Sequence, residues 1–180
     1  MAPIVEPDNA KLICGMISSS ENLFNSAQKK LESLYGPAGI SSEIIPFDFT
    51  NYYFSQMGDG LLRKFIAFDR LIDPAELSDI KRATNDIEAE MARGGTVDRP
   101  INLDPGYVTL HSLVLASMKN FSHRIYLNHG VFAEVTLMYR EGWQSLEWTF
   151  PDYGSGLYFP FLTATRNALR DQIKQEKPKS

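Results

Sequence analysis

Apolar residues along the first third of the chain alternate between short runs and helical repeats. Residues 11–17 (KLICGMI) form an apolar run that is typical of a buried strand. Ser18 to Glu21 then has the spacing of a capping box, and apolar residues recur with helical period up to Gly36 and Pro37. We therefore predict a strand at 11–17 followed by a helix that ends at Gly36.

Two further strands are separated by a long loop. Residues 40–45 and 61–72 are rich in Ile, Leu and Phe, which favours strands. Residues 46–60 (PFDFTNYYFSQMGDG) are aromatic, polar and glycine-containing, which is typical of an ordered loop.

A second helix follows the third strand. Asp73 and Pro74 are typical of a helix start, and apolar residues at helical spacing extend the helix to the glycines at 94–95. Segment 109–118 fits both a helix and a buried strand, and we interpret it as a helix.

The pattern changes to hairpins from His123 onward. Strands are predicted at 123–127, 131–140 and 143–148, joined by turns at 128–130 and 141–142. In the long strand, Val135 falls on the predicted buried face and Glu134 on the partly solvated one. Residues 157–169 are predicted to form a final helix.

This order of elements predicts an α+β fold with a mostly antiparallel sheet and helices packed on one face. We interpret it as a ferredoxin-like core followed by a C-terminal β-meander and helix, because the meander interrupts the βα alternation of a doubly wound sheet. Residues 1–170 are predicted to form a single domain, and 171–180 a basic, disordered tail.

Composition narrows the class of protein. The 180 residues carry a net charge of −4, and residues 166–180 are basic, so the remaining body is acidic. An acidic body argues against nucleic-acid binding, and the sequence contains no apolar run of the roughly 20 residues that cross a membrane. Cys14 is the only cysteine and the start does not resemble a signal peptide, so we predict a cytoplasmic protein.

Well-known catalytic and cofactor motifs do not occur in the sequence. It contains no P-loop, no dinucleotide-binding glycine motif, no G-x-S-x-G elbow and no H-E-x-x-H. One cysteine cannot form a cysteine-paired zinc site. We therefore predict no cofactor.

Three segments combine an acid, a proline and an aromatic residue, around Asp48, Asp104 and Asp152. Such carboxylates could cap turns, act as an acid–base pair or, together with Glu134, bind Mg²⁺ or Ca²⁺. Turn formation is the preferred interpretation and a divalent metal is the weaker alternative.

Two groups of cationic residues flank predicted strands. The first comprises Arg63, Lys64 and Arg70, and the second Lys119, His123 and Arg124. If they meet at one end of the sheet, they form an anion site, to which Tyr107 and Thr109 would add hydroxyl groups. A solvated strand edge is the preferred interpretation of these residues.

Aromatic residues are concentrated in segments 47–54 and 143–161. Most are expected to cover the sheet, and the others either stack on a planar ligand or form a surface for self-association.

Several of these segments resemble a known family. PFDFTNYY with MGDGL, RLIDPAEL, INLDPGYVTL, HRIYLNHGVFAEVTLMY and WTFPDY are similar to the signatures of the bacterial and archaeal domain of unknown function 4416, over residues 11 to about 166. The resemblance implies no established reaction, and a GTP-binding label carried by some members has no P-loop to support it here. It places emphasis on motif residues, namely Asp48, Tyr53, Asp104, Tyr107, His123, Arg124 and Glu134.

Two functional hypotheses follow. The first is a site for a small anionic ligand, phosphate- or nucleotide-like, in which Asp48, Asp104 or His123 is the catalytic candidate and the ligand-binding candidates are Tyr53, Tyr107, Thr109, Lys119 and Arg124. The second is a non-enzymatic protein that forms homodimers through exposed aromatic residues. These residues leave open whether the site catalyses a reaction.

Overall fold

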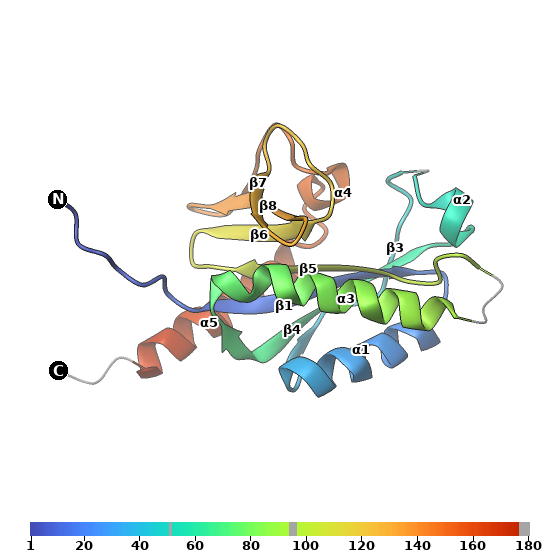
Figure 1. Cartoon of the computed structure of the whole chain (residues 1–180), viewed down its shortest axis with the longest axis horizontal. Coiled ribbons are helices and arrows are strands. Elements are labelled where there is room, and N and C mark those ends of the chain that lie inside the picture. The colour runs from blue at the N-terminus through green and yellow to red at the C-terminus, as the bar shows by residue number, and fades with distance from the viewer. Residues whose placement is uncertain (51, 94–96, 177–180) are drawn as a thin grey trace.

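A large antiparallel sheet organises the chain (Figure 1). The computed structural model describes residues 1–50, 52–93 and 97–176. Nine strands lie in this part of the chain: β1 (Ala10–Ser18), β2 (Ile40–Ser41), β3 (Ile45–Pro46), β4 (Leu62–Ile72), β5 (Asn102–Val108), β6 (Ser112–Ser117), β7 (Ile125–Asn128), β8 (Val131–Tyr139) and β9 (Trp143–Ser145). They are ordered β2-β4-β1-β5-β6-β8-β7, with β3 also paired to β4 and β9 to β8.

Five α-helices accompany the sheet in the described residues. They are α1 (Glu21–Tyr35), α2 (Phe54–Met57), α3 (Leu77–Ala92), α4 (Pro151–Gly154) and α5 (Phe159–Glu176). A 3₁₀ turn at Pro74–Glu76 leads into α3. No described helix combines the length and the apolarity needed to cross a bilayer.

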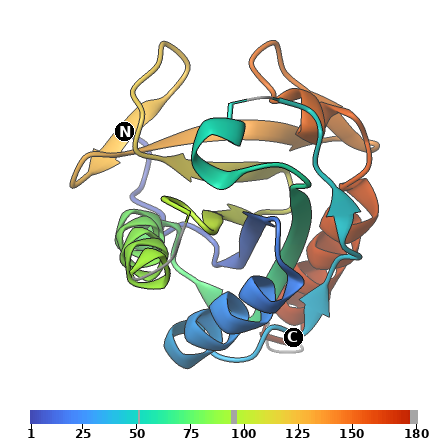
Figure 2. The same ribbon diagram turned by 90° about the vertical axis from the view of Figure 1, so that its right-hand side faces the viewer.

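Helices cover both faces of the sheet, which corrects the prediction of helices on one face. Leu12 and Met16 of β1 pack in one apolar cluster with Phe24 of α1 and Ile80 of α3. Ile13 faces the opposite cluster, which includes residues of α5. Figure 2 shows α1 and α3 on one side of the curved sheet and α5 on the other. Burial of both faces explains why 11–17 is a continuous apolar run.

The α+β class and the mostly antiparallel sheet are confirmed, and the ferredoxin-like core stays a prediction. Such a core contains a split βαβ unit, in which another strand lies between the two strands that a helix connects. Here α1 leads from β1 to β2, and β4 pairs with both of these strands and so lies between them. The sheet continues beyond β1 through β5, β6, β8 and β7.

The structure corrects two local predictions between residues 102 and 117. Residues 102–108 form β5, although Asp104, Pro105 and Gly106 favour a turn. Residues 112–117 form β6 instead of a helix. Leu113 packs toward one apolar cluster and Val114 toward another, so β6 is apolar on both faces and lacks the alternation that identifies a half-buried strand.

Two segments are more helical than their composition indicates. The predicted loop 46–60 begins with the last residue of β3 and contains the short helix α2. Helix α5 continues through 171–176, where the charge pattern predicts a disordered tail. The remaining tail residues, 177–180, lie outside the described residues, as do the glycines at 94–95 that were predicted to end the second helix.

The start of α3 offers a first test of the fold. Asp73 Oδ1 accepts a hydrogen bond from the Ala75 backbone N–H at 2.8 Å, and Glu76 Oε1 accepts one from the Asp73 N–H at 3.0 Å. Asp73→Ala removes half of this capping box, so we expect it to lower the free energy of unfolding by about 1 kcal/mol. Thermal unfolding followed by circular dichroism would measure this loss. Asp86→Ala, at an exposed position within α3, is the control.

Candidate functional site

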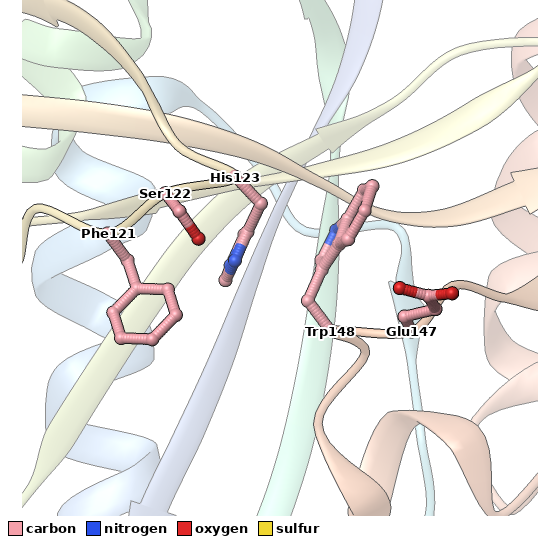
Figure 3. Close-up of a pocket in the computed structure, with 5 residues that line it drawn as sticks. All are labelled: Phe121, Ser122, His123, Glu147 and Trp148. Atoms are coloured by element: carbon pink, nitrogen blue, oxygen red, sulfur yellow. The ribbon is translucent and has the colours of Figure 1, made fainter.

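An open groove of about 640 Å³ lies between the segment that precedes β7 and the segment that follows β9. Phe121, Ser122 and His123 line one side, and Glu147 and Trp148 line the other (Figure 3). The rings of His123 and Trp148 are parallel within 8°, with centroids 5.2 Å apart. In Figure 3 the Glu147 carboxylate lies beyond the Trp148 ring as seen from His123.

A buried carboxylate holds the histidine of this groove in place. His123 Nε2 lies 3.0 Å from Glu134 Oε2, and Arg124 Nε donates to the same oxygen at 2.7 Å. The hydroxyl of Thr136 lies 3.3 Å from the other carboxylate oxygen, Oε1. Only 1% of the Glu134 side chain is exposed, so hydrogen bonds from these protein donors replace the hydration of the carboxylate.

The sequence around β7 and β8 explains how this cluster forms. Arg124 NH1 donates to the Ser117 hydroxyl at 2.9 Å and to the Lys119 carbonyl at 2.8 Å, which fastens the loop between β6 and β7. Glu134 pairs with Leu115 in the sheet and faces the side that carries α5. The loop therefore brings an imidazole and a guanidinium group to one carboxylate.

Glu134 and Thr136 are buried, contrary to the prediction that their face of the strand is partly solvated. A register shift between Leu113 and Val114 leaves Thr136 as an extra residue in β8, so Leu137 shares the inner face with Glu134. Val135, predicted to be buried, is 37% exposed. Because the carboxylate of Glu134 is paired with protein donors, the strand can bury it although the hydrophobic pattern predicts a solvated position.

These contacts assign the roles of the two histidine nitrogens. An ionised carboxylate only accepts hydrogen bonds, so Nε2 of His123 is the donor to Glu134. In the neutral ring Nδ1 is then an acceptor, and in the charged ring it is a donor. The His123 side chain is 14% exposed and lines the groove. A carboxylate that orients an imidazole is a recurring arrangement in proton transfer and anion binding.

A second polar cluster lies deeper in the fold, around Arg63 of β4. Arg63 NH1 lies 3.1 Å from Asp104 Oδ2, and NH2 donates to the hydroxyl of Tyr153. The guanidinium also packs over the ring of Phe65, 4.7 Å from its centroid. The Arg63 side chain is 2% exposed and that of Asp104 is 26% exposed, so this ion pair touches solvent only on its acidic side.

Gly15 of β1 makes room for this ion pair. The register pairs Gly15 with Phe65 on one side and with Asp104 on the other. A Cβ atom at Gly15 would lie 2.8 Å from Arg63 NH2 and equally close to the Phe65 ring. The absence of a side chain at Gly15 thus lets the guanidinium reach across β1 to Asp104.

The two carboxylates near Arg63 differ in pKa. Burial alone would raise the pKa of Asp104, but the charges of Arg63 and Lys81 outweigh it, so the pKa lies below its ordinary value. For Asp152 the effect of burial exceeds that of Arg63, and its pKa is raised. Asp152 Oδ2 accepts a hydrogen bond from the Tyr158 hydroxyl at 3.2 Å.

The structure separates the predicted site residues into groups. His123 and Arg124 meet at Glu134, whereas the Lys119 ammonium group lies over the Tyr52 ring and only the Lys119 backbone carbonyl contacts Arg124. Asp104 and Asp152 both lie near Arg63 instead. Among the described residues no three His, Cys, Asp or Glu side chains form a group that could hold a metal ion.

The remaining candidates lie elsewhere. Asp48 is exposed, and Tyr53 packs on Phe47, with its pKa raised by burial. Tyr107 packs against the apolar cluster on the α1 and α3 face, away from Asp104. Thr109 accepts backbone hydrogen bonds within the turn between β5 and β6.

The proposed meeting of two cationic groups does not occur. Arg63 pairs with Asp104, Lys64 donates to Gln28, and Arg70 pairs with Glu76. Each of these three cations thus has a partner of its own.

Two functional features escaped the sequence analysis. Trp148 was counted among the aromatic residues, but nothing in its spacing pointed to His123, because a stack across two loops depends on tertiary structure. The sequence did contain a signal for Arg63. It lies on the same buried face of a strand as Leu61, Phe65 and Ala67, and a charge on such a face needs a partner of opposite charge in the interior.

Comparison with known proteins identifies the family. No curated protein and no solved structure matches the chain. The family model described as "Domain of unknown function (DUF4416)" matches residues 8–169, which include the groove and the Arg63 cluster. This range also contains all the motifs that suggested the resemblance. The chain therefore belongs to the DUF4416 family.

Proposed function

We propose that the protein binds a small anionic ligand, phosphate- or nucleotide-like, in the groove of His123. The observation that carries the proposal is the hydrogen bond between His123 Nε2 and the buried Glu134, because it fixes the ring at the wall of the groove and engages one of its two nitrogens. A ligand in the groove would contact the other ring nitrogen, Nδ1.

The charges around the groove support an anion. A His123 ring that carries protons on both nitrogens is a cation and presents Nδ1–H as a donor, and Glu134 at Nε2 is then its counter-charge. Lys119 adds a second positive charge in the same loop, where its ammonium group lies over the Tyr52 ring at 4.1 Å. Glu147 is the opposing charge, and its carboxylate lies on the far side of Trp148 from His123 (Figure 3).

The aromatic residues support a planar group on the ligand. Phe121 is 64% exposed and Trp148 is 38% exposed, so each presents open ring surface beside the groove. Proteins commonly hold nucleobases by stacking on such surfaces, whichever base is present. The groove thus combines an anion-binding nitrogen with apolar ring faces. His123 is also the residue here that is suited to general acid–base catalysis.

The test is a thermal-shift screen with inorganic phosphate, nucleoside monophosphates and dicarboxylates. A ligand at a hundred times its dissociation constant stabilises the native state by about 2.7 kcal/mol, which for a chain of this size raises the melting temperature by roughly 5–10 °C. We expect His123→Ala to remove this shift. His111→Ala is the matched control, because His111 is exposed in the turn between β5 and β6.

The same experiment has an internal check. Glu147→Gln removes the opposing charge and should strengthen anion binding. A flat screen, or a shift that His123→Ala leaves intact, would refute the proposal.

A further inference from the structure

We propose that two copies of this chain associate by antiparallel pairing of their β7 strands. Strand β7 is the last in the sheet order and pairs with β8 on one side. Its other side carries a row of backbone N–H and C=O groups that another strand can pair with. This inference does not depend on the proposed function, because it uses the edge of the sheet and not the ring of His123.

Strand β7 is unusually apolar for an exposed edge. All four of its residues are exposed, and three are large and apolar: Ile125 at 71%, Tyr126 at 59% and Leu127 at 39%. Side chains alternate between the two faces of a strand, so apolar surface is exposed on both sides of this edge. In Figure 2 the β7–β8 hairpin projects from the body of the molecule.

The opposite edge of the sheet shows how an unpaired edge is protected. There β4 is flanked by β2 and β3, which are two residues each, and β3 ends at Pro46. Short strands and proline discourage pairing with another chain. Strand β7 contains no charged residue and no proline, so it lacks these protections.

A second copy is the occupant that the charges favour. An antiparallel edge is complementary to itself about a two-fold axis, because each strand offers the same alternating donors and acceptors. Residues 125–128 are uncharged, so two copies can approach without repulsion. Arg124, the nearest cation in sequence, is neutralised within its own chain by Glu134.

The contact would extend beyond the strand itself. The exposed ring of Phe121 lies in the loop that leads into β7, and the Tyr126 ring packs on Phe132 with centroids 5.4 Å apart. Even with these residues a four-residue edge forms a small interface, and interfaces below about 1,200 Å² are weak and transient. The expected assembly is therefore a weak dimer that dissociates on dilution.

Analytical ultracentrifugation over a wide concentration range tests the dimer. Ile125→Lys places a charge on the pairing edge of both copies, and we expect it to raise the dissociation constant about tenfold or more. Leu34→Lys is the matched control, since Leu34 of α1 is 52% exposed and remote in the sheet order from β7. Circular dichroism would show that both variants are folded.

Disulfide trapping tests the register independently of Ile125→Lys. Cys14 is buried, so a single cysteine introduced at each β7 position would be the accessible thiol. A disulfide-linked dimer should form at the positions beside the two-fold axis, where opposite Cα atoms are about 5 Å apart, and not at Leu34→Cys. A monomer at every concentration, or a dimer that neither Ile125→Lys nor the cysteine positions affect, would overturn the proposal.

Discussion

Asp104→Asn is expected to lower the free energy of unfolding by about 3 kcal/mol at neutral pH. The side chain of Arg63 is 2% exposed, and Asp104 is the carboxylate with which it forms an ion pair. Asparagine keeps the size of the side chain but removes that charge, so the guanidinium stays buried without its counter-ion. For a chain of this length the melting temperature should fall by roughly 6–12 °C.

The effect of Asp104→Asn should depend on pH. The folded-state pKa of Asp104 is below its ordinary value, so its charge contributes stability above the unfolded-state pKa of about 3.9. That contribution is lost as the pH falls through the lower folded-state value. The stability difference between the wild type and Asp104→Asn should thus be largest near neutral pH and disappear once the pH has fallen below the folded-state pKa. Urea unfolding at a series of pH values measures it.

A double-mutant cycle separates the ion pair from other effects. Arg63→Met is expected to be destabilising as well, and the two changes together should cost less than the sum of the single changes, with a coupling of about 2 kcal/mol. Asp48→Asn is the control, because Asp48 is exposed and its change should stay within about 0.5 kcal/mol. Additive effects of the two changes would show that Arg63 and Asp104 do not stabilise the fold as a pair.

Gly106→Ala is expected to destabilise the protein by about 3 kcal/mol. Gly106 lies in the middle of β5, where it pairs with Ile13 of β1 and with Leu115 of β6. A Cβ atom there would lie 2.4 Å from the backbone carbonyl oxygen of Val114. Backbone cannot move aside as a flexible side chain can, so β5 and β6 would have to separate.

A second glycine provides the comparison for this effect. Gly142 lies between β8 and β9, and an added Cβ atom would meet no heavy atom within 4 Å. Gly142→Ala should therefore be close to neutral, or slightly stabilising through the unfolded state. Chemical unfolding of the two variants measures the contrast. Equal stability of Gly106→Ala and Gly142→Ala would show that the strands accommodate the methyl group.

Local sequence patterns were sufficient to predict a helix that buries one apolar stripe and a strand that is apolar along its whole length. Helix α1 has a repeating apolar face, and β4 is a long and largely apolar run. The capping box predicted from Ser18 to Glu21 is wrong, because the N-cap residue is Ser20 and it makes no side-chain cap hydrogen bond. The α+β class and the hairpins that join β7, β8 and β9 follow from the same reasoning. The predicted meander is wrong in its strand order, because β6 occupies one edge of β8 and β7 and β9 pair with the other. Such features depend on neighbours within a few residues, which a sequence displays directly.

The polar sites could not be predicted in this way. Strict alternation along β8 places Glu134 on a partly solvated face, because alternation alone does not include the extra residue in this strand. Asp104 was treated as a turn residue because Pro105 and Gly106 usually end a strand, whereas here the strands on either side of β5 impose an extended backbone. In both cases the partner that decides the role lies on another element.

The sequence by itself determined the class of fold, most of the helices and long strands, and the family. Only the tertiary structure decided that Arg63 meets Asp104 across Gly15, that Glu134 holds His123, and that β7 is left at an apolar edge. The physical reason is that hydrophobic periodicity records which face of an element is buried. It does not record which element covers that face, and charge pairing across the sheet depends on that choice.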